Sequence, residues 1–424
     1  MNIYLGSIGC RLNQSELEIM AAALRRAGHV IVAAPENAQA AIINSCCVTV
    51  AAEADSRKLL HRLERNGVQH IYLTGCWVSP SGSVQEPLPE RTIVVPNAQK
   101  DMLVEQFFSD GMEISSNVSP RMALPGKGRR TRAFIKVQEG CDYHCTFCIT
   151  RIARGKSISR PYGEILHDIQ AAEMADVKEI VLTGTQLGGW GRELDGEKTI
   201  AALVRMIMRD TEIPLVRLSS LEPWDVVEDF PALLLNERFC DHLHLPLQSG
   251  SESTLRRMGR TMTPQDFRTL VQNLRKVNPL IALTTDIVVG FPGETEEEFA
   301  ESLAFVQEMD FSGGHVFRFS PRPGTPAASY PNQVDGLQKR ERNRQMRAVL
   351  RDSAIRYRAR FMGQKIRVVW ERGKLTQEGT WLMSGLSTNY LRVKAVSAEN
   401  RWNMISEVEI LEDKDGYLLG KIER

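Results

Sequence analysis

The first hundred residues alternate short apolar runs with stretches of helical periodicity. The apolar runs predict buried strands at residues 3–5, 41–43, 71–73 and 93–95. Between them, residues 15–27 and 52–66 predict helices, the first with Leu17, Met20 and Leu24 on one face. Strands that alternate with helices in this way are typical of βαβ units. We therefore predict a doubly wound parallel sheet over residues 1–108.

A second alternation of strands and helices fills residues 132–360. Its apolar runs predict six strands, at residues 134–138, 179–183, 215–219, 242–245, 284–289 and 315–319. Helical patterns such as 164–175 and 296–309 separate most of these strands. A complete parallel barrel has eight strands, so six predict a partial (βα)6 barrel. Residues 109–131 carry Gly, Pro, Ser and basic side chains without any period, which predicts a linker.

The pattern changes again near the C-terminus. Residues 339–360 predict one long helix. Four short apolar runs with turns between them follow, at residues 366–370, 390–394, 408–411 and 418–421. They predict a small β-barrel over residues 361–424. The expected fold class is therefore α/β, with an N-terminal parallel sheet, a central partial barrel and a C-terminal β-barrel.

The composition is that of an ordinary globular protein. Of the 424 residues, 42% are hydrophobic and 25% are charged, which excludes a disordered, collagen-like or coiled-coil chain. No apolar run approaches the roughly 18 residues of a membrane span, and we read no signal peptide. We therefore expect a cytoplasmic protein without a membrane partner. The net charge is only +1, so a nucleic acid would have to bind a local basic patch.

Three cysteines share one short loop directly after the first strand of the predicted barrel. Cys141, Cys145 and Cys148 have CxxxCxxC spacing. A structural zinc site usually takes four ligands, whereas a [4Fe–4S] cluster with three cysteine ligands keeps one iron open. The barrel's C-terminal mouth, where this loop is expected, is where such folds keep their active sites. An incomplete zinc site or plain structural cysteines are the alternatives.

The loop resembles the signature of the radical S-adenosylmethionine (SAM) superfamily. Phe147, directly before the third cysteine, also matches. The resemblance implies that SAM chelates the open iron. It implies further that one electron, from an external donor such as flavodoxin or ferredoxin, releases a 5′-deoxyadenosyl radical. Radical chemistry needs no tuned acid–base pair, and we predict no catalytic side chain.

A second set of cysteines is scattered along the N-terminal sheet. Cys10, Cys46 and Cys76 each follow a predicted strand. Parallel strands present their C-terminal ends at one edge of a sheet, so the three thiols are expected to converge and to hold a cluster with an open iron. Cys47 is an alternative to Cys46. Adjacent side chains of an extended segment point to opposite sides, so only one of the two is expected to be a ligand.

Several motifs, taken together, resemble the methylthiotransferase family. They are GCRLNQ at 9–14, INSCCVT at 43–49, TGC at 74–76, residues 139–148 and 180–184, HLPLQSG at 244–250 and DIVVGFPGET at 286–295. The resemblance implies two [4Fe–4S] clusters, of which the N-terminal one holds the sulfur to be inserted, and a sulfur donor. It implies a tRNA substrate, with a methylthio group placed on a modified adenosine beside the anticodon.

The motif GCRLNQ and the context of HLPLQSG look most like the threonylcarbamoyladenosine-specific group of this family. Isopentenyladenosine in tRNA and an aspartate of a ribosomal protein are the alternative targets. A non-enzymatic iron–sulfur electron carrier or RNA-binding sensor is the remaining alternative. Carriers usually have full Cys₄ ligation, so two three-cysteine sites argue against a carrier.

Other positions at the ends of barrel strands are candidate SAM contacts. Gly184 follows the second strand, where the wider superfamily has a GGE-like segment, although this chain has no Glu there. Ser220 and Glu222 follow the third strand and Gln248 the fourth. A structural role at the rim of the barrel is the alternative for each of them.

The long helix at 339–360 carries a basic stripe. At 100° per residue, one face combines Arg340, Arg344, Arg347, Arg351 and Arg358. Another face combines Met346, Val349, Leu350 and Tyr357. We predict that the basic stripe contacts the RNA backbone, and a solvated helix face is the alternative.

The segment that follows the helix resembles the small RNA-binding β-domain, TRAM-like, that closes many members of the family. Residues 389–393 carry most of this resemblance. Trp381 and Tyr390 are expected either to stack on bases or to form the core of the barrel.

Overall fold

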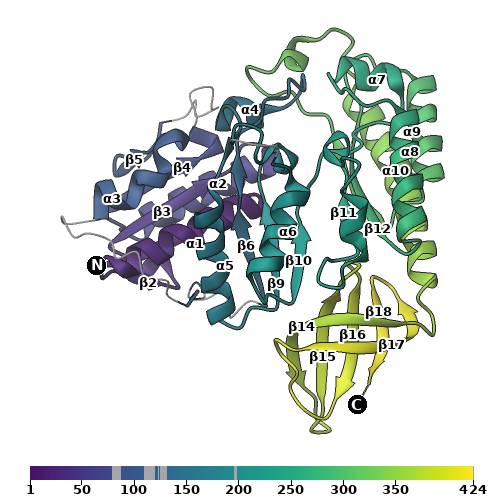
Figure 1. Cartoon of the computed structure of the whole chain (residues 1–424). Coiled ribbons are helices and arrows are strands. Elements are labelled where there is room, and N and C mark those ends of the chain that lie inside the picture. Colours follow the sequence, from purple (N-terminus) through teal and green to yellow (C-terminus); the bar gives the residue numbers. More distant parts are fainter. Residues whose placement is uncertain (79–86, 109–119, 123, 125–130, 195–197, 424) are drawn as a thin grey trace.

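The computed structural model describes residues 1–78, 87–108, 120–122, 124, 131–194 and 198–423. Figure 1 shows the N-terminal sheet beside two further groups of strands and helices, with a small barrel of strands below them. The predicted fold class, an α/β chain that ends in a β-barrel, is confirmed. Most of the predicted linker at 109–131 lies outside the described residues, and the boundaries of the three parts stay predictions.

The N-terminal sheet is parallel throughout, in the order β2-β1-β3-β4-β5. Its strands are β1 (Asn2–Ser7), β2 (Val30–Val32), β3 (Ala40–Ser45), β4 (His70–Gly75) and β5 (Thr92–Val94). All six residues of the central strand β3 are buried. The short edge strand β2 was not predicted.

Helices cover both faces of this sheet, as the prediction of a doubly wound fold requires. They are α1 (Arg11–Arg26), α2 (Val50–Arg65) and the short α3 (Leu103–Phe108). Ile42 of β3 belongs to the same apolar cluster as Leu17 of α1, whereas the next residue, Ile43, packs in a cluster with Leu60 of α2. Successive side chains of a strand point to opposite faces, which explains this division.

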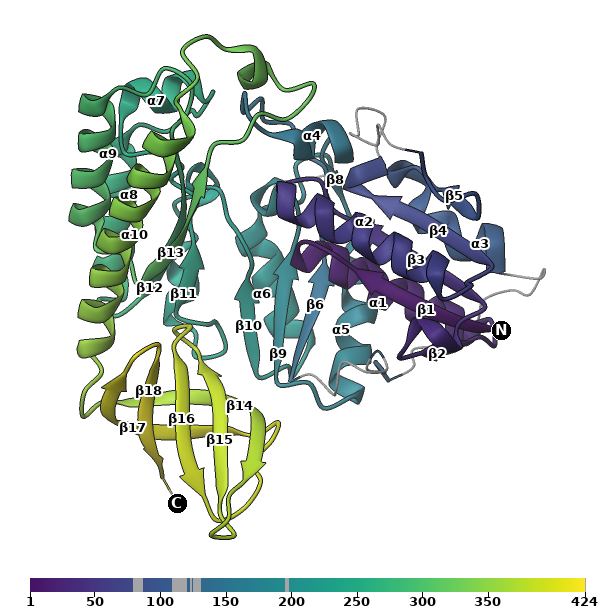
Figure 2. The same cartoon turned by 180° about the vertical axis from the view of Figure 1, so that it is seen from behind.

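The central part contains the six expected strands, arranged as two parallel three-stranded sheets. The first sheet has the order β10-β9-β6, from β6 (Arg132–Lys136), β9 (Glu179–Thr183) and β10 (Leu215–Leu218). The second has the order β11-β12-β13, from β11 (His242–His244), β12 (Ala282–Val289) and β13 (Gly313–Arg318). One apolar core joins both sheets, and Figure 2 shows them as the two halves of a partial barrel.

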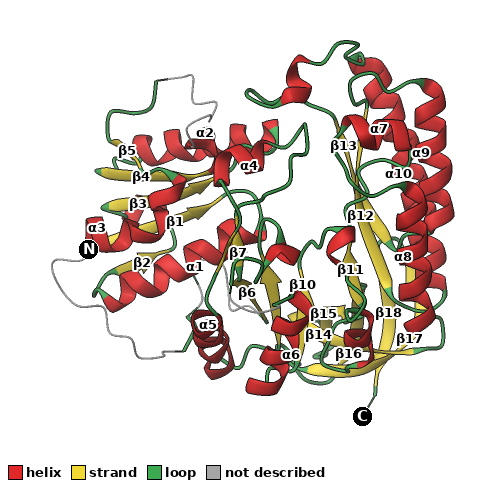
Figure 3. Cartoon of the chain, turned by 45° about the horizontal axis from the view of Figure 1, so that its top comes forward, coloured by secondary structure: helices red, strands yellow, loops and turns green. Residues whose placement is uncertain are grey.

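Helices cover the outside of the partial barrel, as Figure 3 shows. They are α5 (Tyr162–Met174), α6 (Ile200–Asp210), α7 (Glu252–Arg257), α8 (Pro264–Val277) and α9 (Glu296–Met309). The predicted long helix is α10 (Gly336–Ala359), whose first N–H groups are capped by the side chain of Asp335. Within the described ranges, every helix is too short or too polar to span a bilayer.

The C-terminal strands close into a barrel in the order β14-β15-β16-β18-β17. They are β14 (Lys365–Leu375), β15 (Trp381–Ser387), β16 (Arg392–Ser397), β17 (Ile405–Lys414) and β18 (Tyr417–Ile422). Strand β15 was missed in the sequence, because Ser384 and Gly385 interrupt its apolar run. The glycine is required there, since a Cβ at Gly385 would lie 2.4 Å from the carbonyl oxygen of Val369 on the paired strand.

Two buried networks of charges connect these parts. In the first, Glu16 of α1 lies 2.8 Å from Nη1 of Arg154 and 2.6 Å from Nζ of Lys100. In the second, Arg217 of β10 donates to Glu179 of β9 at 2.6 Å. Arg217 also donates to the carbonyl oxygens of Ser387 and Thr388, at the end of β15, at 3.1 and 3.0 Å. These contacts fix the N-terminal sheet and the C-terminal barrel against the central strands.

Candidate active site

The three N-terminal cysteines line one cavity of about 640 Å³. Cys10 precedes α1, Cys46 follows β3 and Cys76 follows β4, so the order of the strands brings them to one edge of the sheet. Gly9 permits this approach: its φ is +104°, and a Cβ there would lie 2.8 Å from Sγ of Cys46. The structure thus brings together the three thiols that the sequence predicted to converge.

Cys47 lies in different surroundings. Its Sγ donates to the carbonyl oxygen of Cys76 at 3.2 Å. It is 2% exposed and belongs to an apolar cluster that includes Leu73 and Trp77. Cys46, in contrast, lies on the wall of the cavity beside Gly9. The geometry favours Cys46 as the ligand.

A buried arginine stands behind the N-terminal thiols. Nε of Arg154, the last residue of α4 (Ile149–Arg154), donates to Sγ of Cys76 at 3.2 Å. Burial raises the pKa of the Cys76 thiol, and Arg154 opposes this shift. Burial also raises the pKa of Cys46 to about 11, and Cys76 and Cys10 add to the shift. Metal binding would remove these protons, and the guanidinium is placed to stabilise the negative charge that results.

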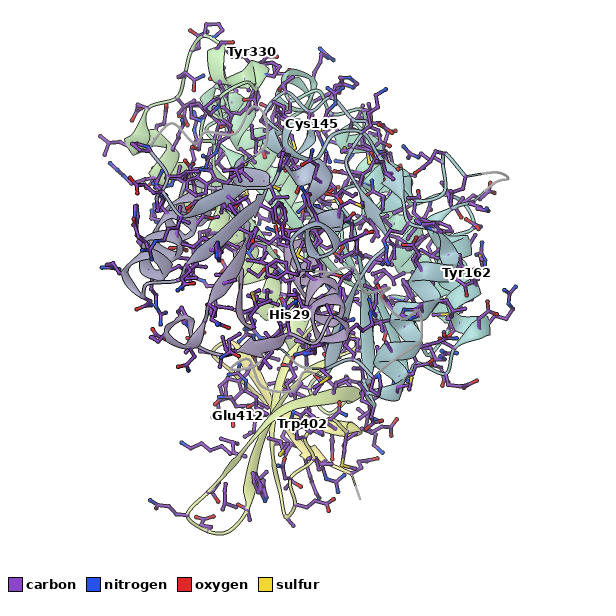
Figure 4. The ribbon with its side chains drawn as sticks, turned by 90° about the vertical axis from the view of Figure 1, so that its left-hand side faces the viewer. His29, Cys145, Tyr162, Tyr330, Trp402 and Glu412 are labelled. Atoms are coloured by element: carbon purple, nitrogen blue, oxygen red, sulfur yellow. The ribbon has the colours of Figure 1, made fainter. Side chains whose placement is uncertain are left out.

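The second set of cysteines lies in the loop that joins two short strands, β7 (Gln138–Glu139) and β8 (Ile158–Ser159), and contains α4. Figure 4 shows Cys145 far from Trp402 and Glu412 of the C-terminal barrel. The amide of Cys141 donates to the carbonyl oxygen of Gly155, and the amide of Cys148 to that of Cys145. Burial raises the pKa of Cys141 to about 12, and Cys148 and Cys145 add to the shift. The three thiols are therefore close enough to influence one another.

Two glutamines that the sequence did not single out as site residues hold this loop. Oε1 of Gln186 accepts from the amide of Asp142 at 3.0 Å, and Oε1 of Gln138 accepts from the amide of Gln186 at 2.8 Å. A Cβ at Gly184 would lie 2.9 Å from Oε1 of Gln138. Gly184 thus permits the close approach of Gln138, and it also lines the 640 Å³ cavity. Its contact with SAM stays a prediction.

Two further predicted SAM contacts, Ser220 and Glu222, lie in different surroundings. Ser220 lines the 640 Å³ cavity. Glu222 accepts from Nη2 of Arg260 at 2.6 Å, and Nη1 of the same arginine lies 3.7 Å from Sγ of Cys145. Arg260 was not predicted. Its charge opposes the rise that burial causes in the pKa of Cys145.

A second cavity, of about 760 Å³, adjoins the first. Phe147, Cys148 and Gln248 lie on its wall. Both cavities share Val48, Thr150, Asp286 and Phe317, so a space extends from Cys10, Cys46 and Cys76 at the N-terminal sheet to Cys148 beside the barrel strands. Phe147 packs edge-on against Phe291 at 6.2 Å between ring centroids.

The chemistry of the donors suits iron–sulfur clusters. Each site offers three thiols. In the part of the chain that the structure describes, no group of three His, Cys, Asp or Glu side chains is placed to hold a single metal ion. A cluster has a larger span, because each cysteine binds a different iron. Three thiols at each site fit a [4Fe–4S] cluster that keeps one iron open, whereas a structural zinc ion usually takes four ligands.

The exposed arginines of α10 reach the second cavity. Arg340, Arg344, Arg347 and Arg351 are all exposed, and Arg340 and Arg347 line that cavity. Arg344 is paired with Glu341 and Arg351 with Asp352. The fifth member of the predicted stripe, Arg358, is different: it is half-buried and binds Asp413 of β17 at 2.8 Å. This ion pair connects α10 to the C-terminal barrel, and the other four arginines of the stripe are the ones that we assign to RNA contact.

The two candidate stacking residues of the C-terminal barrel also differ. Trp381 packs against the core of the barrel. Tyr390 lies in the turn before β16, not in a strand as predicted, and lines the 640 Å³ cavity. Its ring stacks on His242 of β11, with centroids 4.3 Å apart and planes at 12°.

The chain matches two family models. The Radical SAM superfamily matches residues 135–306, and the model described as Uncharacterized protein family UPF0004 matches residues 2–95.

Curated relatives cover almost the whole chain. A protein of Thermotoga maritima named threonylcarbamoyladenosine tRNA methylthiotransferase MtaB is 37% identical over 87% of this chain and 86% of its own length. A Bacillus subtilis protein of the same name is 33% identical over 97% and 93%. A tRNA-2-methylthio-N(6)-dimethylallyladenosine synthase of Ehrlichia canis is 30% identical over 99% of both chains.

Among solved structures, the fold is similar to the radical S-adenosylmethionine methyltransferase TsrM of Kitasatospora setae. The TM-score is 0.57, over 77% of this chain and 75% of that chain. The sequence identity is 15%, so this likeness concerns the fold alone.

Proposed function

The chain belongs to the radical SAM methylthiotransferase family, and on this basis we propose that it modifies tRNA by inserting a methylthio group at C2 of N6-threonylcarbamoyladenosine next to the anticodon. One observation carries the proposal: Cys10, Cys46 and Cys76 line one cavity, and Cys148 of the second cysteine set lines the cavity that adjoins it. Radical formation and sulfur storage need two such sites within reach of one substrate. The names of the relatives support the nucleoside.

Members of the radical SAM superfamily use SAM and a [4Fe–4S] cluster. We assign Cys141, Cys145 and Cys148 as the ligands of that cluster, and Cys10, Cys46 and Cys76 as the ligands of a second one. When bound, these groups would supply the 5′-deoxyadenosyl radical and the sulfur, and a second molecule of SAM the methyl group. A radical is required because the C2–H of adenine is not acidic enough for an ordinary side-chain base. This agrees with the expectation that no side chain is a general base here.

The chain's own residues position these groups and compensate their charge. Gln138 and Gln186 fix the cysteine loop through its backbone. Arg154 and Arg260 each bring a guanidinium to one cysteine site. Phe147, Gly184, Ser220, Glu222 and Gln248 are our candidate SAM contacts.

The remaining partners follow from this chemistry. The enzyme needs an external one-electron donor, such as flavodoxin or ferredoxin, and a donor of sulfur. We propose the cytoplasm as its location, because its tRNA substrate is there. Isopentenyladenosine, a ribosomal-protein aspartate and a non-enzymatic carrier or sensor are less favoured, since relatives that are 37% and 33% identical to this chain are named for threonylcarbamoyladenosine.

Mass spectrometry of tRNA nucleosides tests the proposal. A deletion strain should lack 2-methylthio-N6-threonylcarbamoyladenosine and accumulate its precursor, and the wild-type gene should restore the product. The triple variant Cys141→Ala, Cys145→Ala, Cys148→Ala should form neither product nor 5′-deoxyadenosine. The triple variant Cys10→Ala, Cys46→Ala, Cys76→Ala should still cleave SAM but form no product. An unchanged nucleoside profile in the deletion strain would refute the proposed function.

A further inference from the structure

Arg11 presents an unpaired positive charge to the cavity that Cys10, Cys46 and Cys76 line. The residue directly follows Cys10 and lies on the wall of the 640 Å³ cavity. Its Nη2 donates to the hydroxyl of Tyr390 at 2.5 Å. Its guanidinium lies 5.8 Å from the ring centroid of Tyr390 and 5.9 Å from that of Phe134. One hydrogen bond to a hydroxyl leaves most of the five N–H donors of an arginine available.

The other arginine on this wall is neutralised by the protein itself. Arg154 is paired with Glu16 and with Glu139. The carboxylate of Asp286 lies 3.3 Å from Nε2 of His244, an ion pair only when that ring is protonated. Burial holds the pKa of His242 well below its usual range, so this ring is neutral. In the described part of the chain, Arg11 is the arginine of this wall without an oppositely charged partner.

The position of Arg11 is fixed by a turn from the far end of the chain. Tyr390, which accepts its hydrogen bond, has a φ of +66°, a value that a tyrosine adopts only when its surroundings impose it. The stacked ring of His242 and the anchoring of Ser387 and Thr388 by Arg217 supply that constraint. A guanidinium held in place loses less side-chain entropy when it binds a ligand.

Further polar atoms on the same wall also lack partners. Nδ1 of His242, Oγ of Ser219, Oγ1 of Thr185 and Oδ1 of Asp286 are buried and without hydrogen bonds. Buried polar atoms in a native protein normally have partners, so a polar ligand is expected to bind here. A cavity that combines unpaired hydrogen-bonding atoms with a fixed guanidinium is suited to a ligand that carries a carboxylate.

We infer that Arg11 binds the carboxylate of the threonyl group on the target adenosine and thereby selects this nucleoside. This inference rests on the proposed function. The threonylcarbamoyl group is attached at N6, the amino nitrogen on the six-membered ring of adenine that also contains C2. Holding this substituent near Cys10 therefore orients C2 within the cavity. A dimethylallyl group has no charge and would leave the guanidinium of Arg11 unpaired. Arg11 is thus a residue that determines specificity.

Two synthetic anticodon stem–loops test this inference. They are identical except that the threonyl carboxylate of one is replaced by a neutral carboxamide. The dissociation constants of both are measured anaerobically with the holoenzyme. A charge-assisted hydrogen bond in a partly buried site is expected to make the wild type bind the carboxylate form about tenfold more tightly than the carboxamide. Arg11→Leu should bind both with the affinity that the wild type has for the carboxamide, and Arg11→Lys should retain most of the preference.

Arg26→Leu is the matched control, because it removes an exposed arginine from the other end of the same helix. It should keep the tenfold preference. The inference is overturned if Arg11→Leu still prefers the carboxylate stem–loop. It is also overturned if Arg11→Leu weakens the binding of both stem–loops equally or loses iron, because either result would assign Arg11 to the N-terminal cluster. In these cases the wild type still converts the carboxylate stem–loop to its methylthio product. Absence of that product with the wild type would refute the proposed function and this inference with it.

Discussion

At the scale of single residues, Cys46 and Cys47 are neighbours whose thiols lie in different places. One lines the cavity with Cys10 and Cys76, and the other packs among apolar side chains. We predict that Cys46→Ala loses one of two clusters, so that iron falls from about eight to about four atoms per chain. Cys47→Ala should keep the full iron content, because alanine also fits an apolar pocket. Iron analysis of the anaerobically purified proteins measures this.

The reverse result, with iron lost in Cys47→Ala and kept in Cys46→Ala, would mean that the ligand was wrongly chosen. If neither Cys46→Ala nor Cys47→Ala lowered the iron content, the N-terminal cluster itself would be contradicted. Cys240→Ala controls for the loss of any buried thiol, since Cys240 is fully buried and lies in neither set of cysteines.

The positions of single residues were predictable where the order of strands along the chain determines them. Cys10, Cys46 and Cys76 each follow a strand of a parallel sheet, and topology then brings them together. Arg11, Arg154 and Arg260 could not be predicted, because their partners are distant in sequence. The hydrogen bond between Arg11 and Tyr390 joins residues 379 positions apart. Hydrophobic periodicity carries no information about such contacts.

At the scale of elements, the four exposed arginines of the α10 stripe fall into two groups of two. Arg340 and Arg347 make no ion pair within the described residues and line the second cavity, whereas Arg344 and Arg351 have acidic neighbours. We predict that Arg340→Ala with Arg347→Ala lowers the salt slope of tRNA binding by about two units. Arg344→Ala with Arg351→Ala should lower it by about one unit or less, because their charges are already partly compensated.

Binding isotherms at several salt concentrations measure both slopes. All tRNAs should weaken alike, since phosphate contacts carry no sequence information. If neither double variant changes the slope, the stripe is a solvated helix face and not an RNA contact. Equal effects of the two pairs would contradict the argument from ion pairing.

The elements themselves were predictable where the apolar pattern is strong. The predicted strand at 179–183 and helix at 296–309 have the bounds that the structure gives them. Strands β2 and β15 were missed for different reasons: β2 has only three residues at a sheet edge, and β15 contains a glycine required by close backbone approach. Hydrophobic periodicity detects a strand through its buried face. Strands β2 and β15 form because neighbouring strands pair with them, and the periodicity does not show this pairing.

At the scale of the whole molecule, the buried charges around Glu16 connect the N-terminal sheet to the central strands. Glu16 is 2% exposed, and Arg154 and Lys100 contact its carboxylate. Although burial alone would raise the pKa of Glu16, the coulombic effect of Arg154, Lys100 and Lys136 holds it well below its ordinary value of 4.5. The carboxylate therefore stays charged in the folded protein and stabilises it.

We predict that Glu16→Gln lowers the free energy of unfolding by about 3–5 kcal/mol at pH 7, because it leaves three buried cations, Arg154, Lys100 and Lys136, to share the carboxylate of Glu139. Since the pKa of Glu16 is lower in the folded than in the unfolded state, its stabilisation is complete above about pH 5 and is lost as the pH falls through the folded-state pKa. The difference between wild type and variant should therefore shrink with acidification. Urea unfolding at several pH values, followed by tryptophan fluorescence, measures it.

Glu252→Gln makes the same chemical change in an exposed ion pair with Arg256. It should cost less than about 1 kcal/mol at every pH, because exposed pairs contribute little. If Glu16→Gln had no larger effect than this control, the buried network would not hold the N-terminal sheet in place. Its cysteines would then need another constraint to face the barrel, and the cavity between the two cysteine sites would not depend on Glu16.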